Sequence, residues 1–183
     1  MILFTTSHRP SPRTRSFIKD LASIIPFAQR VNRGHKSLVE LALETKRLGY
    51  NYLAIVSEKH GNPSMISLYE IVDGYPYPST KSLAKILLKG VKLSRENPEA
   101  SRAYSAKTIG VDFSRCISGD CYYLSDLLIR IFSKIYSDNP DLKLILEEDA
   151  FIVFKCINVH GRVIGPVLRI SKVIREVSNG SFS

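Results

Sequence analysis

Residues 2–25 read ILFTTSHRPSPRTRSFIKDLASII, and this stretch predicts a strand that leads directly into a helix. Residues 2–6 are a short apolar run typical of a buried strand. Ser11 and Pro12 then open a helix over about 13–25, because proline suits the first helical position. Apolar residues fall on one stripe at helical spacing, at Phe17, Ile18, Leu21, Ile24 and Ile25. A strand followed by an amphipathic helix is the first unit of an α/β fold.

The pattern continues to about residue 93. Residues 27–31 could form a second strand, followed by the turn Asn32-Arg33-Gly34. Ser37 and Glu40 stand at the spacing of a capping box and begin a helix that reaches about Leu48. Three further strands are expected, at 52–57, 65–72 and 83–93, although the last segment could also be a helix.

A polar linker is expected over about 97–104, after which the same plan restarts. We predict a strand at 108–113, a long helix from Asp120 whose apolar face reaches Ile135, and strands at 142–146, 151–159 and 163–173. The repetition indicates two similar α/β halves, residues 1–104 and 105–183, packed into one domain.

The charge distribution indicates a polyanionic partner. The net charge is +9, and residues 1–47 carry nine basic against three acidic side chains, whereas residues 108–183 carry nine of each. All the excess positive charge therefore lies in the first 107 residues. A one-sided excess favours nucleic acid, with an acidic membrane surface or an acidic protein as alternatives.

Several classes of protein are disfavoured. No apolar run approaches the roughly 20 residues of a membrane span, and the first residues lack the features of a signal peptide, so we expect a soluble, cytoplasmic protein. The three cysteines, Cys116, Cys121 and Cys156, fit no zinc pattern. Buried free thiols are favoured, with a Cys116–Cys121 bridge as the alternative if the source is a hyperthermophile. No catalytic constellation is evident, so neither an enzyme nor a cofactor is expected.

Basic residues gather at two strand-to-helix junctions. The first junction carries Arg9, Arg13, Arg15 and Lys19, and the second carries Arg30, Arg33 and Lys36. If the two strands are parallel neighbours, both junctions lie at the carboxyl edge of the sheet, where helix starts would offer unpaired amides to phosphate. The alternative is a set of ordinary solvated charges. Three tyrosines could stack on bases, but core or turn packing is favoured for each: Tyr75, Tyr77 and Tyr104.

Four segments resemble the Brix-domain proteins, above all the Imp-type members found in archaea as single short chains. They are residues 5–13 (TTSHRPSPR), 17–21 (FIKDL), 26–34 (PFAQRVNRG) and 55–63 (IVSEKHGNP). His8 stands where the family pattern has Arg. The last segment contains the charged turn with Lys59. The match is specific over residues 2–75 and loose afterwards.

The resemblance implies that the whole chain is one Brix domain, built of two halves that are each similar to the anticodon-binding domain of class II tRNA synthetases. It also implies a role in ribosome assembly. Our hypothesis is a non-catalytic factor that binds precursor ribosomal RNA and contacts other assembly factors or ribosomal proteins. The candidate RNA-binding residues are Arg9, Arg13, Arg15, Lys19, Arg30, Arg33, Lys36 and Lys59. The alternatives are a tRNA- or anticodon-binding accessory module and a protein-interaction adaptor.

Overall fold

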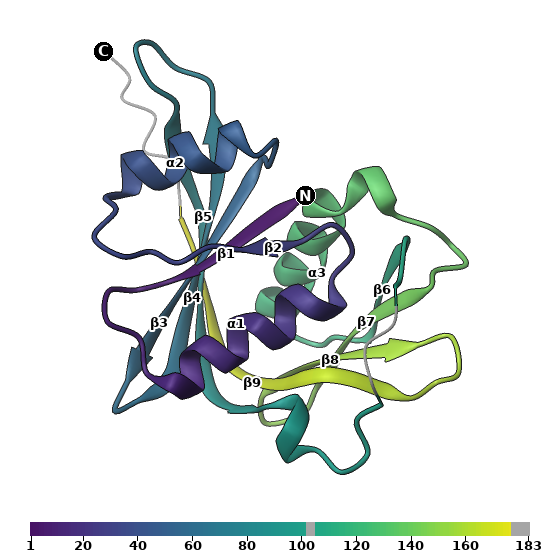
Figure 1. The fold of residues 1–183 in the computed structure, drawn as a ribbon. Coiled ribbons are helices and arrows are strands. Elements are labelled where there is room, and N and C mark those ends of the chain that lie inside the picture. Colours follow the sequence, from purple (N-terminus) through teal and green to yellow (C-terminus); the bar gives the residue numbers. More distant parts are fainter. Residues whose placement is uncertain (102–104, 177–183) are drawn as a thin grey trace.

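The computed structural model describes residues 1–101 and 105–176. It contains a nine-stranded sheet in the order β2-β1-β3-β4-β5-β9-β8-β7-β6 (Figure 1). The elements along the chain are β1 (Ile2–Thr6), α1 (Pro12–Ile24), β2 (Gln29–Arg30), α2 (Leu38–Arg47), β3 (Tyr52–Lys59), β4 (Asn62–Val72), β5 (Ser79–Lys92), η1 (Ser94–Glu96), β6 (Ile109–Arg115), α3 (Gly119–Ile131), η2 (Ser133–Ile135), β7 (Leu142–Glu148), β8 (Ile152–Asn158) and β9 (Val163–Arg175).

The sheet has the same order of pairings on each side of its centre. Strand β1 is parallel to β3, and β3, β4 and β5 follow one another antiparallel. Strand β6 is likewise parallel to β7, and β7, β8 and β9 follow antiparallel. The antiparallel β5–β9 pair joins the two sets. The predicted boundary at residue 104 lies outside the described residues, and the division into two halves stays a prediction.

Helices cover the two faces of the sheet unequally. Helices α1 and α3 pack on one face, where the larger core includes Phe17, Leu21, Leu124 and Leu127. Helix α2 packs on the other face, where Leu41 and Ala42 join a smaller core with Leu3 and Leu53; Figure 1 shows α2 apart from the other two helices. Successive side chains of β1 point to opposite faces of the sheet, so Leu3 packs in the core with α2 and Phe4 packs in the core with α1.

Two predicted elements are shorter in the structure. The strand predicted at 27–31 pairs only over Gln29–Arg30, because Phe27 turns the chain with a positive φ of 57°. The long helix ends at Ile131 rather than continuing through Ile135. Phe132 leaves the helical conformation there and buries its ring, and a separate 3-10 turn follows. The segment at 83–93, which could have been a helix, is the long strand β5.

The cysteines divide into a bridged pair and a buried thiol. Cys116 and Cys121 form a disulfide, with a Cα–Cα distance of 5.4 Å, so the favoured expectation of free thiols is wrong for them. They meet because β6 runs almost directly into α3, where Cys121 lies in the first turn. Cys156 is free and buried, as expected, and burial raises the pKa of its thiol. Among the described residues no helix is long and apolar enough to cross a membrane.

Candidate nucleic-acid interface

The two basic junctions meet at one edge of the sheet, as the sequence predicts. Strands β1 and β2 are parallel neighbours, so the loops that follow them lie side by side. His8 Nδ1 lies 3.0 Å from the carbonyl oxygen of Gly34 and links the two loops. Between them is a hollow of about 490 Å³, which we call the basic groove, lined by Thr6, Arg9, Pro10, Arg15, Ile18, Val31, Asn32, Arg33, Gly34 and His35.

Three predicted arginines line the basic groove. Arg9 comes from the loop after β1, Arg15 from the first turns of α1, and Arg33 from the loop after β2. Arg33 donates through Nε to the backbone oxygen of Lys36, at 3.2 Å. Within the part of the chain that the structure describes, none of the three forms an ion pair. Their charges are therefore available to an anionic ligand, which arginine binds in a bidentate way.

Three further predicted cations are exposed around the groove. Lys19 lies one turn after Arg15 on the same side of α1, and Arg30 is on β2 opposite Phe4. Lys59 ends β3, which is parallel to β1, so it lies at the same sheet edge. No ion pair involves these three side chains among residues 1–101 and 105–176. They extend the positive surface beyond the groove itself.

Arg9 has an unusual backbone conformation for its residue type. Its φ is +50°, in the left-handed region that few non-glycine residues adopt. Such a conformation costs about 1 kcal/mol or more and tends to occur at functional sites. Here it turns the loop between β1 and α1, and Arg9 lines the groove.

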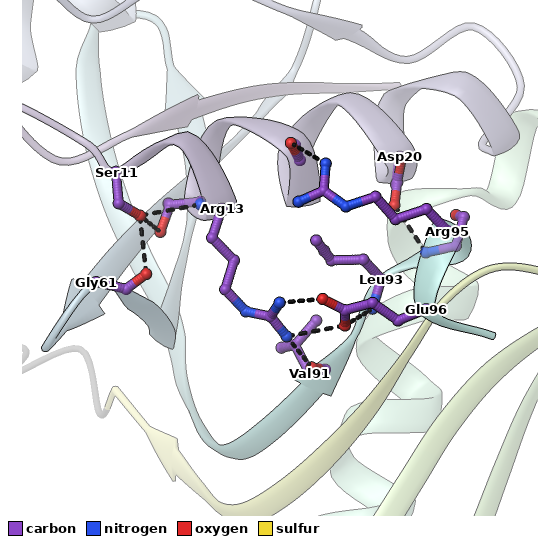
Figure 2. A network of polar contacts seen from close by, with 11 residues as sticks. Ser11, Arg13, Asp20, Gly61, Val91, Leu93, Arg95 and Glu96 are labelled. Carbon is purple, nitrogen blue, oxygen red and sulfur yellow. Dashed lines mark hydrogen bonds and ion pairs between the residues drawn. The ribbon is translucent and has the colours of Figure 1, made fainter.

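Arg13 does not belong to the groove. Figure 2 shows its guanidinium turned toward η1, where it pairs with the carboxylate of Glu96. It also donates to the backbone oxygen of Val91, at 2.9 Å. The hydrogen bond with Glu96 raises the pKa of Arg13, and the same bond lowers the pKa of Glu96. Arg13 thus fastens α1 to the end of β5, which is a structural role.

We expect Arg13→Ala to destabilise the protein by about 1 to 2 kcal/mol, because it leaves Glu96 without its bidentate partner and the Val91 carbonyl without a donor. RNA affinity should change by less than about threefold, since the side chain faces away from the groove. Urea unfolding and a binding titration of the same preparation measure both quantities. A large loss of affinity with unchanged stability would contradict this assignment.

Lys36 is partly neutralised. Its Nζ lies 2.7 Å from Glu44 Oε2 and donates to the backbone oxygen of Asn32, at 3.3 Å. This arrangement ties the loop after β2 to α2. Lys36 therefore contributes less free charge than the sequence suggests.

Two amides at each helix start, that of the cap residue and that of the third helical residue, already have a side-chain partner. The Ser11 amide donates to Glu58 Oε2 at 2.9 Å, and the Thr14 amide donates to the Ser11 hydroxyl. At α2, Ser37 and Glu40 satisfy each other's amides in the capping box. A hydrogen bond from the Thr14 hydroxyl is the main cause that lowers the pKa of Glu58. The prediction is therefore wrong for these four amides and stays a prediction for the remaining amides of the two first turns.

The tyrosines lie elsewhere. Tyr75 is fully exposed in the loop between β4 and β5, so the favoured expectation of core or turn packing is wrong for it, whereas Tyr77 is largely exposed but lines a hollow beside Leu38 and Ala42 of α2. Strand β4 is antiparallel to β3, which places this loop at the sheet edge away from the basic groove. Tyr104 lies outside the described residues. Asn32 and His35 line the groove but were not predicted to bind; their place between Arg30 and Lys36 was the available signal.

No metal centre is evident. Among residues 1–101 and 105–176, no group of three or more His, Cys, Asp or Glu side chains could hold a metal ion.

Comparison with known proteins decides the family. No family model matches the chain. Over 182 residues the chain is 35% identical to the probable Brix domain-containing ribosomal biogenesis protein of Aeropyrum pernix, covering 96% of this chain and 98% of that relative. The chain belongs to the Brix-domain family. The Brix relative from Pyrococcus abyssi is 30% identical, over 96% of this chain and 85% of its own length.

Solved structures agree with this assignment. The crystal structure of a probable ribosomal biogenesis protein from Aeropyrum pernix matches with a TM-score of 0.77 and 34% identity, over 93% of this chain and 95% of the other. An archaeal Imp4-like protein has the same fold, with a TM-score of 0.69 at 23% identity, over 96% of this chain and all of the other. The family resemblance and the α/β Brix fold predicted from the sequence are confirmed.

Proposed function

We propose that this Brix protein acts in ribosome biogenesis by binding precursor ribosomal RNA through the basic groove, without chemistry of its own. The observation that carries the proposal is the convergence of Arg9, Arg15 and Arg33 from two loops onto one hollow, with no carboxylate pairing them among the described residues. The names of the Brix relatives, as probable ribosomal biogenesis proteins, supply the biological setting.

The groove has the chemistry of a phosphate-binding surface rather than a base-reading one. Three of its ten lining residues are arginines, and Asn32 and His35 are the two others in that lining whose side chains carry nitrogen. The exposed tyrosines that could stack on bases lie at the other sheet edge. Arginine contacts to phosphate fix the position of a nucleic acid but carry little sequence information. We therefore expect recognition of RNA shape and backbone.

The test compares a structured fragment of precursor ribosomal RNA with a tRNA of similar length, across a range of salt concentrations. Three arginine–phosphate contacts alone give a slope of log affinity against log salt of about −2 to −3. We expect that slope or a steeper one, with the ribosomal fragment bound more tightly. A salt-independent affinity would overturn the electrostatic interface. Tighter binding of tRNA would instead favour a tRNA-binding accessory module.

Crosslinking of the full chain to RNA in its own cells, followed by sequencing, supplies the matching test in vivo. We expect enrichment of precursor ribosomal RNA. A predominance of tRNA reads would contradict the proposed substrate while leaving the interface intact.

A further inference from the structure

The outer edge of β6, at the end of the sheet farthest from β2, has main-chain groups that meet no backbone partner. Alternate residues of a strand direct their N–H and C=O groups to opposite neighbours. The Leu142 amide donates to Thr108, on the β7 side, whereas the Ser137 amide donates to Ile109, on the outer side. Val111 therefore also faces outward, and Phe113 follows at the start of a bulge between Asp112 and Arg115, where the pairing with β7 is interrupted. Among the described residues, no segment pairs with the Val111 main chain or the Phe113 amide.

The corresponding edge of β1 is covered. There, β2 pairs with Leu3 and Phe4, and the Val31 amide donates to the Phe4 oxygen at 2.9 Å. Strands β1 and β6 occupy matching places, since each is parallel to the first strand of an antiparallel run, β3-β4-β5 for β1 and β7-β8-β9 for β6. Their third residues, Phe4 and Val111, both direct their carbonyl groups outward. Within residues 1–101 and 105–176, the chain thus supplies a covering strand at one end of its sheet and none at the other.

The two strands match in a second detail. The Ser11 amide at the start of α1 donates to Glu58 on β3, at 2.9 Å. The Ser118 amide at the start of α3 donates to Glu148 on β7, at 2.7 Å. The same cap in both places supports the correspondence between β1 and β6, and with it the comparison of their outer edges.

A hollow runs along the open edge. It measures about 330 Å³, and Val111, Phe113 and Tyr136 contribute to its lining. Phe113 meets Tyr122 edge to face, with ring centroids 6.4 Å apart. Tyr122 is 47% exposed, and Ile117, in the loop between β6 and α3, is 75% exposed. Apolar side chains beside unpaired main-chain groups are the features of a site for an added strand.

The charges at this edge favour a polypeptide over RNA. The hollow is lined by two carboxylates, Asp112 and Asp138, and one cation, Lys143. Arg115, at the end of β6, pairs with Glu147 at 3.5 Å. A phosphate backbone would meet net negative charge here. A second copy of the chain would place the two carboxylate pairs face to face, because a two-fold axis sets β6 against β6.

We propose that the outer edge of β6 receives an extended segment of a partner protein. The segment pairs in parallel with residues 111–113, as β2 pairs with β1, and places an apolar side chain against Phe113 and Tyr122. The inference does not depend on RNA binding, since the basic groove lies at the other end of the strand order. One molecule can then hold RNA at one end of its sheet and a protein at the other.

The first experiment is photocrosslinking of the full chain in its own cells. The photoreactive residue p-benzoylphenylalanine replaces Phe113 in one variant and the remote, fully exposed Tyr75 in the control. We expect position 113, but not 75, to crosslink to one segment of one protein, mapped by mass spectrometry. Crosslinks to RNA, crosslinks to a second copy, or no crosslink above the control level would each overturn the proposal.

The mapped segment is then made as a synthetic peptide and titrated against the purified chain. Its binding should slow the hydrogen exchange of the Val111 and Phe113 amides, while the already paired amides of Gly110 and Asp112 change little. Unchanged exchange at 111 and 113 would contradict strand addition even where the peptide binds.

A matched pair of variants isolates the main-chain contact. Phe113→Pro removes an N–H that has no partner among the described residues and lies at the bulge in the β6–β7 pairing, and Phe113→Ala removes only the ring. We expect the proline variant to bind the peptide about tenfold more weakly than the alanine variant, because it loses a donor and adds a steric obstacle. Equal affinities would contradict the proposal. RNA binding should be the same in both variants, and if the proline variant fails to fold, the exchange measurement decides.

Discussion

Replacing Arg9, Arg15 and Arg33 together with alanine should lower the affinity for structured ribosomal RNA by about a hundredfold or more at 0.1 M salt. Each guanidinium–phosphate contact contributes about 1 to 2 kcal/mol, and three contacts at one groove act on the same ligand. The slope of log affinity against log salt should become shallower by about 2 to 3, since three counterion-releasing contacts are lost. Filter binding or fluorescence anisotropy over a salt series measures both quantities.

The control must remove the same charge from another place. Arg47, Lys81 and Lys107 are exposed cations outside the basic groove, and none of them forms an ion pair within residues 1–101 and 105–176. Their triple replacement with alanine should weaken binding by less than about fivefold, through long-range attraction alone. Equal losses in the two triple variants would mean that net charge, and not the groove, governs binding.

The stability of the groove variant should stay close to that of the original chain, because exposed charges contribute little to folding. Arg13 is left out of the triple for this reason. Its pairing with Glu96 and Val91 means that an affinity lost on replacing it could reflect a loosened α1 rather than a lost RNA contact.

The sequence already indicated that Arg13 and Arg15 have different surroundings. Successive residues of a helix are rotated by about 100°, so Arg13 and Arg15 point about 200° apart, whereas Arg15 and Lys19 share a side. The two arginines could not both face one groove. The actual partner of Arg13 was not predictable, since Glu96 is 83 residues away and comes close only when the fold brings the end of β5 and η1 beside α1.

At the helix starts, too, contacts between residues close in sequence were predictable, and contacts between distant residues were not. The α2 start was predictable, because Ser37 and Glu40 form a capping box within four residues. That motif already implied that the amides of Ser37 and Glu40 were occupied. At α1 the occupant is Glu58, 47 residues from Ser11, and only the folded sheet brings it there. The convergence of the two basic loops was predictable because it requires nothing beyond parallel neighbouring strands.

The central joint of the sheet could not be predicted. Periodicity predicted that β5 and β9 are strands but carried no signal that they pair with each other. In the structure, Leu88 pairs with Ile170, and the Ser171 hydroxyl donates to the backbone oxygen of Leu87, 84 residues earlier. Nor did it indicate that α1 would pack on β9. That contact depends on one glycine, whose environment only the structure discloses.

Gly165→Ala should destabilise the protein by about 2 to 4 kcal/mol, through backbone strain and a clash together. Gly165 lies on β9 with φ at +70°, where a side chain is disfavoured. An added Cβ would also stand 2.3 Å from Cδ1 of Ile24 and 3.2 Å from both of its γ carbons. Ile24 is buried at the end of α1, so it has little room to move. For a chain of this size the melting temperature should fall by about 5 to 15 °C.

Gly161→Ala separates the two causes. Gly161 has nearly the same φ, +72°, but nothing lies within 4 Å of the position of its Cβ. Its replacement should therefore show the strain alone, about 1 kcal/mol. Ile24→Val in the Gly165→Ala background removes Cδ1 and should recover part of the clash, as a coupling of about 1 kcal/mol in a double-mutant cycle. If the two glycine variants lose the same stability, the clash with Ile24 does not contribute to the destabilisation by Gly165→Ala, and this prediction is wrong. A larger loss at Gly165 would mean that the contact between Ile24 and Gly165 holds α1, the helix beside the basic groove, against β9.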